Sequence, residues 1–507
     1  MKTVFYALVT ILALTLSAGA AERRIALVVG NANYQTGSLP TPANDAGLVA
    51  QTLQAAGFDV AGARDLDQES LRRAFRDFLK ASSSGPDTVA YIYLSGYGVQ
   101  LEGENYLVPI DARIANDTSV SVEALRLSDY IRPLAALHLK TTVIVLDLAR
   151  ANPFARSGNP LTGGLALVDT EPGTLIAFNA TPGTIAPDEA GPYSAYAQAL
   201  AEISREGGLP IDDVFARVRL RVNQITNGGQ VPWHVSKLET PIHLFERAPD
   251  APPPQVTAEQ TASIRRRPIR EFDAREAYLA ALDRDTLEGY EDFVAAYPRD
   301  PMARRVRAII AARREAIIWR RTRNYDTPQA YWSYQQRYPR GAHAYDCRRR
   351  LAYLSAALEP PPTFIVVDYG LPPPPPDEIV YVERPLLVFD DPEFSFEPRY
   401  SDYFWAAVLV LFGLGSAGAW FRHYLKRDER ELRPVSLRIA VGPPGSPLAR
   451  AVASRASEVI LLSRGPTAMN APLEAIYLSI KFSSPSVAAL HAPAEMPHRT
   501  LFGSPVS

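Results

Sequence analysis

The side chains that could do chemistry follow two apolar runs in the N-terminal half, in residues 95–98 and 147–154. Ser95 offers a hydroxyl group, which becomes a useful nucleophile only when an adjacent base takes its proton. The imidazoles of the same half belong to His138, His234 and His243. Their spacing from Ser95 matches no known serine–histidine motif, and the single cysteine, Cys347, lies far along the chain. A hydrolase that uses Ser95 is therefore an alternative without a motif to support it.

Short β-branched runs alternate with segments of helical period between Arg24 and Arg247. The predicted buried strands are 25–29, 89–94, 143–146 and 175–178, and the clearest amphipathic helices are 71–79 and 211–225. This alternation predicts an α/β fold, with a mostly parallel sheet flanked by helices. Ligands of such sheets bind outside the carboxyl ends of the strands. Residues 95–98 and 147–154 are therefore expected to meet at one edge of the sheet.

A series of short motifs accompanies these two segments. In chain order they are Gly30-Asn31-Ala32-Asn33-Tyr34, Ala43-Asn44-Asp45-Ala46, Leu94-Ser95-Gly96-Tyr97-Gly98, Asn105-Tyr106-Leu107-Val108-Pro109, Leu146-Asp147-Leu148-Ala149-Arg150 and Gln230-Val231-Pro232-Trp233. Each motif alone is weak, but their order from Arg24 to Leu244 resembles the caspase-like cysteine peptidases, the metacaspase or p20-type branch of peptidase family C14 (clan CD). The resemblance covers a little under half of the chain.

The resemblance implies a catalytic histidine in the first segment and a catalytic cysteine in the second. Active relatives read Ser-Gly-His-Gly and Asp-Ala-Cys-Arg there, whereas this chain has Tyr97 and Ala149. The two positions are separated by about the 50 residues typical of caspases. The reaction needs a thiolate nucleophile and an imidazole that titrates near neutral pH, and neither a methyl group nor a tyrosine hydroxyl with an ordinary pKa of about 10 replaces them. The dyad is degenerate, and we expect a pseudopeptidase.

The resemblance also implies a binding pocket in which acidic side chains accept arginine or lysine. That role falls on Asp147 first and on Asp45 and Asp188 more weakly, and the backbone amide of Gly98 is the candidate oxyanion donor. An alternative for Asp147 is an acid that caps the loop after its strand. The expected function is binding of proteins or peptides, including basic ones, by a scaffolding module. The competing hypothesis is a hydrolase of the same family, with Arg/Lys preference, that acts through non-standard residues.

An internal repeat with a period of 41 residues follows the caspase-like domain (21–248) and a linker at 249–267. It aligns Asp285-Thr286 with Asp326-Thr327. Residues 268–358 are therefore predicted to form two helical hairpins that resemble the tetratricopeptide class. Two copies are marginally stable alone, so we expect them to pack on another part of the chain. In this register Cys347 is expected to be a buried apolar residue rather than a reactive thiol.

The two ends of the chain predict export and a membrane anchor. Residues 1–20 combine a basic start, an apolar run and a small-residue cleavage pattern, which is typical of a signal peptide, although an uncleaved anchor is the alternative. A Pro-rich spacer (359–402) leads to an uncharged stretch at 403–421 flanked by aromatic residues, a predicted transmembrane helix. Acidic residues precede it and basic residues follow it. The main domain is therefore expected outside the inner or plasma membrane, with a largely disordered tail (422–507) in the cytoplasm.

Composition excludes several other classes of function. The formal net charge is -2, from 53 basic and 55 acidic residues, so nucleic acid is not an expected partner. One cysteine excludes an intramolecular disulfide and cysteine-rich structural zinc sites. No metal site and no cofactor are expected.

Overall fold

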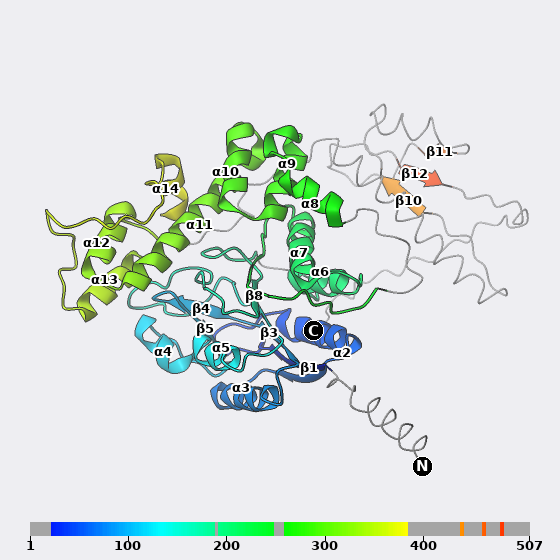
Figure 1. Ribbon diagram of the computed structural model, residues 1–507, viewed down its shortest axis with the longest axis horizontal. Coiled ribbons are helices and arrows are strands. Elements are labelled where there is room, and N and C mark those ends of the chain that lie inside the picture. The colour runs from blue at the N-terminus through cyan, green and yellow to red at the C-terminus, as the bar shows by residue number, and fades with distance from the viewer. Residues whose placement is uncertain are drawn as a thin grey trace, which may run out of the picture. The chain divides into compact units, whose positions relative to one another are not determined.

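The computed structural model describes residues 22–187, 191–247 and 258–383, together with the backbone of three short strands further on (Figure 1). The chain divides into two compact units, Met1–Phe396 and Glu397–Ser507. In the second unit, β12 (Tyr477–Ile480) pairs antiparallel with β10 (Leu437–Ala440) and β11 (Val459–Leu462). These strands lie within the predicted tail, whose short apolar runs are suited to strand pairing.

The first unit contains a six-stranded sheet. Its strands, in spatial order, are β2 (Asp59–Arg64), β1 (Arg23–Gly30), β3 (Thr88–Ser95), β7 (Thr141–Asp147), β8 (Thr174–Phe178) and β9 (Trp233–Ser236). Neighbours pair in parallel except β9, which runs antiparallel to β8. The four strands predicted from the β-branched runs are all present, so the mostly parallel α/β fold is confirmed.

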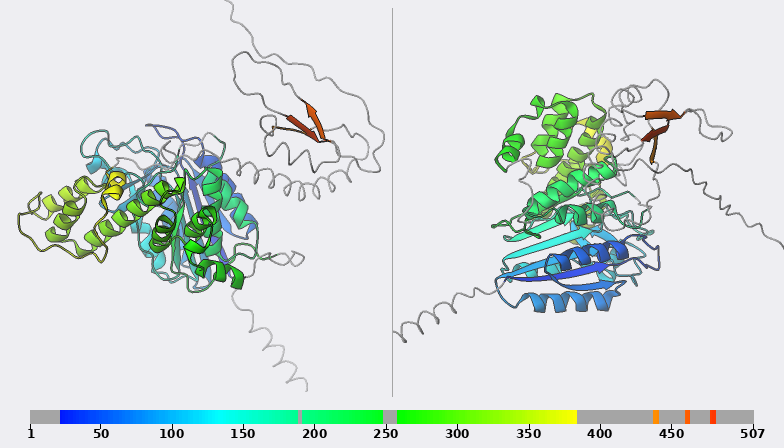
Figure 2. Two further views of the ribbon diagram at one scale, coloured as in Figure 1. Left: turned by 90° about the horizontal axis from the view of Figure 1, so that it is seen from above. Right: turned by 90° about the vertical axis from the view of Figure 1, so that its right-hand side faces the viewer.

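Helices cover both faces of this sheet, as Figure 2 shows. One face packs against α2 (Pro42–Ala55), α6 (Ala195–Ser204) and α7 (Ile211–Ile225), and the other against α3 (Gln68–Ser82) and α5 (Ser128–Ala135). Successive side chains of β3 point to opposite faces of the sheet. Tyr91 therefore packs in the core on the first face and Ile92 in the core on the second. Both predicted amphipathic helices lie within α3 and α7. A small antiparallel sheet and a short helix complete the domain: β4 (Gly98–Leu101), β5 (Glu104–Leu107), β6 (Leu125–Arg126) and α4 (Val120–Glu123).

A helical region follows, and the bounds of its helices repeat with the 41-residue period seen in the sequence. Its helices are α8 (Ala258–Arg266), α9 (Ala274–Arg284), α10 (Leu287–Ala296), α11 (Pro301–Tyr325), α12 (Pro328–Arg337), α13 (Ala344–Tyr353) and α14 (Pro376–Val382). Helix α12 has the bounds of α10 moved by 41 residues. Asp285 and Asp326 end the preceding helices with φ of 52° and 46°, and Thr286 and Thr327 then cap the next ones. The continuous helix α11 joins the two copies.

The helical region is fixed to the α/β domain by buried polar contacts. Arg219 on α7 lies 2.9 Å from the carboxylate of Asp285, and Arg349 on α13 lies 2.7 Å from Asp117. His343 Nε2 lies 3.0 Å from the Gln100 side-chain oxygen on β4. These contacts place the helices against the α/β domain, where two marginal repeats gain the packing partner they need.

Residues 359–383 continue along the helical region instead of leaving it. The segment 359–375 has no regular structure, and α14 then packs on α11. Cys347 is fully buried, as predicted, and burial raises the pKa of its thiol well above the ordinary value. Among the described residues, no helix has both the length and the apolar character needed to cross a membrane. The predicted signal peptide (1–20) and membrane span (403–421) lie outside the described residues.

Candidate functional site

The two segments singled out in the sequence meet at the carboxyl edge of the sheet. Strands β3 and β7 are neighbours, and Ser95 pairs in register with Asp147. The N–H of Gly96 donates to the Asp147 carbonyl at 3.3 Å, and the N–H of Gly98 donates to the Leu148 carbonyl at 2.9 Å. The predicted juxtaposition of the two loops is therefore confirmed.

Tyr97 is built into an aromatic cluster beneath the edge of the sheet. Its ring makes edge contacts with Tyr34 and Phe154, with centroids 4.8 and 5.3 Å apart. Its backbone N–H donates to the Tyr34 hydroxyl at 2.9 Å. Tyr97 is 6% exposed and belongs to this apolar core. A large ring can be retained here for packing alone, because aromatic pairs stabilise a core beyond their buried area.

Ala149 presents only a buried methyl group at the other dyad position. The residue is 1% exposed, and its N–H donates to the Asn179 side-chain oxygen at 3.0 Å. The Gly98 amide, the expected oxyanion donor, is also engaged, since it donates to Leu148. The start of β4 is thus held against the loop that follows β7, and the oxyanion role of Gly98 stays a prediction.

Asp147 is surrounded by donors from its own domain. The hydroxyl of Tyr93 donates to the carboxylate at 2.9 Å, and those of Ser95 and Ser194 lie at 3.3 Å. The guanidinium of Arg150, three residues further on, is 2.9 Å away. A buried carboxylate is tolerated only with such partners. The arrangement matches the alternative in which Asp147 holds the loop that follows its strand.

Asp45 lies in the same cluster. Its carboxylate accepts the Ser194 N–H at 2.8 Å and is 4.0 Å from the Arg150 guanidinium. Burial, and then the charge of Asp147, raise the pKa of Asp45 to about 7, against the lowering effects of the Ser194 amide and Arg150. The structure therefore brings together two of the three predicted pocket acids, with an internal arginine beside both. Asp188 lies outside the described residues.

Residues 23–243 match the family model of the caspase domain, Peptidase_C14. The chain contains a caspase domain. The resemblance proposed from the motifs is thereby confirmed, as is its caspase-like α/β fold. No curated protein matches the chain. The caspase domain thus has Tyr97 and Ala149 at the positions that the motifs assign to the histidine and the cysteine.

The histidines of the caspase domain do not assemble a replacement dyad with Ser95. His138 is exposed just before β7 begins, at the opposite end of that strand from Asp147. Burial and the charge of Arg219 lower the pKa of His234 to about 3, and Arg219 lies 2.9 Å from its Nδ1. The carbonyl of His243 accepts from Arg24, near the start of β1. Across the described residues, no hydrogen bond joins Ser95 to an imidazole.

Three residues of the site were missed in the sequence: Arg150, Asn179 and Ser194. Arg150 carried a signal, because a basic residue three positions after an acid can pair with it. No local signal links Asn179 or Ser194 to the site. Asn179 follows β8 and Ser194 caps α6, and both contact the loop after β7 only through the tertiary fold.

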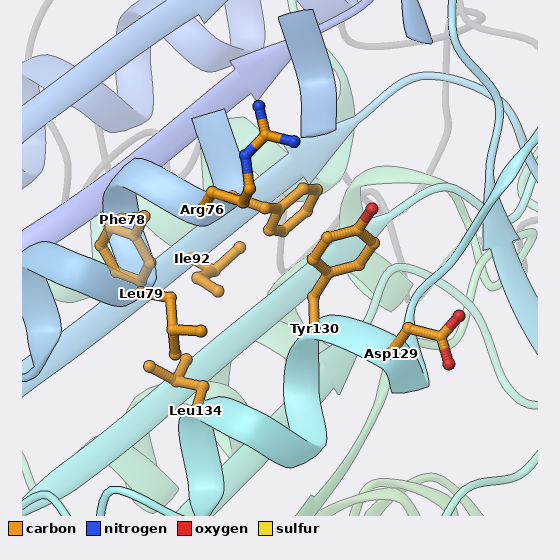
Figure 3. Close-up of a pocket in the computed structure, with 8 residues that line it drawn as sticks. Arg76, Phe78, Leu79, Ile92, Asp129, Tyr130 and Leu134 are labelled. Carbon is orange, nitrogen blue, oxygen red and sulfur yellow. The ribbon is translucent and has the colours of Figure 1, made fainter. Parts of the chain in front are cut away.

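A separate apolar cavity of about 180 Å³ opens between α3 and α5 (Figure 3). Its lining includes Phe75, Ile92 and Tyr130, and the rings of Phe75 and Tyr130 stack at 4.5 Å. None of its lining residues belongs to the two loops. The cavity is thus distinct from the candidate site of the caspase domain.

Asp45→Asn is expected to flatten the pH dependence of stability. A carboxyl group whose pKa rises on folding contributes to stability. This contribution is fully present below the pKa of the group in the unfolded chain, which is about 3.9. The contribution disappears as the pH rises through about 7, the folded pKa of Asp45. The wild type is expected to lose on the order of 3 kcal/mol of its free energy of unfolding between about pH 4 and pH 8. Asparagine does not titrate, so the Asp45→Asn variant should lack this loss. Urea unfolding across this range measures it, with the exposed Asp169→Asn as control. Identical pH profiles for wild type and Asp45→Asn would contradict the expectation.

Proposed function

We propose that the caspase domain of this chain is a pseudopeptidase that binds protein or peptide partners without cleaving them. The observation that carries the proposal is the side chain at the nucleophile position, the buried methyl group of Ala149. A methyl group has neither a lone pair to attack a carbonyl carbon nor a proton to transfer. The fold therefore retains its framework without the group that performs the first step.

The surroundings of Ala149 support the same conclusion. Oxyanion stabilisation needs backbone amides aimed at the developing charge. The amides of Gly98 and Ala149 instead donate to Leu148 and Asn179. A basic side chain of a ligand would reach Asp147 and Asp45 only by displacing Arg150, which already lies beside both. Both amides and both acids are thus engaged in contacts within the domain.

The full-length chain is expected to release no fluorophore from Arg- or Lys-containing peptide amides above the buffer rate, with or without calcium. The reason is that no nucleophile–base pair is present, and the loss of both members removes the covalent route. The assay is run beside Ser95→Ala and Tyr97→Phe, with mass spectrometry after treatment with an electrophilic probe. Turnover that disappears in either variant, or a probe adduct on Ser95, would support the competing hydrolase hypothesis and overturn this proposal.

We further propose that the protein is tethered by residues 403–421, with the caspase domain exported and the tail in the cytoplasm. The support is the apolar stretch with acidic residues before it and basic residues after it, together with the signal-like residues 1–20. Protease added to cells with an intact inner membrane should digest the caspase domain and spare an epitope after residue 422. The reverse pattern of protection would contradict this topology.

A further inference from the structure

The segment after the last repeat helix is held by side chains of α11 and α12 that bind its main chain. Ser333 Oγ accepts the N–H of Val367 at 2.9 Å. The guanidinium of Arg321 donates to the Tyr369 carbonyl, and that of Arg337 donates to the carbonyls of Leu371, at 2.7 Å, and Pro372. The face of α11 and α12 that carries Arg321, Thr322, Ala330, Trp332, Ser333 and Arg337 is called the α11–α12 face below.

Alternate side chains of the segment point into this face. Val367, Tyr369 and Leu371 are buried or half-buried, and Gly370 turns the chain between the last two with a left-handed φ of 64°. Phe364 adds an edge contact with Trp332 at 5.8 Å. Ile365, in contrast, is 83% exposed. The segment thus has one face that is bound and one face that is free.

Tyr369 is the anchor of the segment. Its ring lies in the core of the second repeat with Tyr331 and Leu351. Its hydroxyl donates to the Ala330 carbonyl at 2.7 Å and accepts from Thr322 Oγ1 at 2.9 Å. A buried hydroxyl with both partners in place is a specific recognition feature, because a side chain without it loses both hydrogen bonds.

This pattern differs from ordinary packing between helices. The segment from 359 to 375 has no regular secondary structure, and side chains of α11 and α12 bind its backbone groups. Extended peptides are recognised in this way, by contacts to the main chain and by pockets for alternate side chains. The affinity then depends on the spacing of a few anchors, and a segment of another protein with the same spacing fits equally well.

We propose that the α11–α12 face is a peptide-docking site whose occupant in this structure is the chain's own segment 363–372. The partner is a protein with a segment of the same chemistry: an aliphatic residue, a tyrosine two positions later, a glycine that allows the left-handed turn, and a leucine-proline pair directly after it. It displaces the internal segment and takes over its contacts. This inference extends the proposed binding function to a second surface, and it rests on that function only in assuming that the chain binds partners.

Tethering sets the conditions under which exchange is observed. A segment attached by a short linker acts at an effective concentration in the millimolar range. A free peptide added at micromolar concentration therefore competes poorly with the intact internal segment. Weakening the internal anchor removes this competition and leaves Thr322 and Ala330 available to the tyrosine of the added peptide.

The test measures binding of a fluorescein-labelled peptide of residues 362–375 to the full-length chain by fluorescence anisotropy. The Tyr369→Ala chain is expected to bind at least about tenfold more tightly than the wild type. Should Tyr369→Ala not fold in thermal melts, the Phe364→Ala/Leu371→Ala double variant carries the test, because it removes two other apolar contacts of the segment and lets the added peptide displace the internal Tyr369 more easily. The Ile365→Ala chain is the matched control and should behave as the wild type.

Peptide variants separate specific docking from general stickiness. The peptide with Tyr369→Ala should lose at least about tenfold in affinity for the released chain, whereas the peptide with Ile365→Ala should keep its affinity. No binding to a folded released chain, equal binding to wild type and released chains, or equal binding of the two peptide variants would each overturn the proposal. The peptide-amide hydrolysis assay is independent of these outcomes, so failure here leaves the pseudopeptidase proposal intact.

Discussion

Replacing Asp285 with alanine is expected to lower the free energy of unfolding by about 3–5 kcal/mol, the effect of breaking a buried ion pair. Its carboxylate lies 2.9 Å from Arg219 and 2.6 Å from Arg313 and accepts the Tyr290 hydroxyl at 2.8 Å. Arg219 is 1% exposed. The alanine variant leaves two buried guanidinium groups with one partner fewer, at the contact between the caspase domain and the helical region. Urea unfolding monitored by circular dichroism measures the loss.

The repeat itself supplies the matched control. Asp326 occupies the equivalent position, with a similar left-handed backbone and a hydrogen bond from Tyr331. Its side chain is 36% exposed, against 8% for Asp285. Asp326→Ala should therefore cost no more than about 1 kcal/mol beyond the shared backbone effect, because exposed ion pairs contribute little. Equal losses for the two variants would show that burial does not govern the contact at Asp285.

Arg150→Ala is expected to lower the free energy of unfolding by about 3 kcal/mol or more at neutral pH, because two buried carboxylates would lose the cation beside them. Asp147 and Asp45 lie 2.9 and 4.0 Å from the Arg150 guanidinium. The loss should be smaller at pH 5, where Asp45, with a pKa of about 7, is already protonated and neutral. Thermal and urea unfolding at pH 5 and pH 8 give the comparison.

Two further variants test whether charge is the cause. Arg156→Ala removes an exposed arginine from the same loop and should be nearly neutral. The double variant Asp45→Asn/Arg150→Ala should lose less than the sum of the single losses, because removing one of two like charges offsets removal of the cation. Strict additivity, or a loss that does not change with pH, would indicate that Arg150 acts through packing alone.

Arg150, Asn179 and Ser194 pair with polar groups of the two loops. Such internal satisfaction stabilises the fold, since a buried polar group without a partner is costly.

Much of the fold was predictable because its signals are local. The strands at 25–29, 89–94, 143–146 and 175–178 follow from β-branched runs, whose period and burial are properties of neighbouring residues. The meeting of residues 95–98 and 147–154 follows from the rule for parallel sheets. The identities of Tyr97 and Ala149 required no structure, because the chemistry that a methyl group lacks is a property of the residue itself.

The tertiary structure alone decided how the polar groups are paired. Nothing near Gly98 in the chain indicates that its amide donates to Leu148, and nothing near Asp45 indicates that it shares Arg150 with Asp147. Likewise, Asp285 and Asp326 are equivalent in the repeat, yet only the first is buried against Arg219. Water and protein groups can both serve as hydrogen-bond partners of a charged or amide group. The residue types and their spacing therefore do not determine which partner each group has. The partner is fixed when folding removes water from one set of contacts and leaves it around the other.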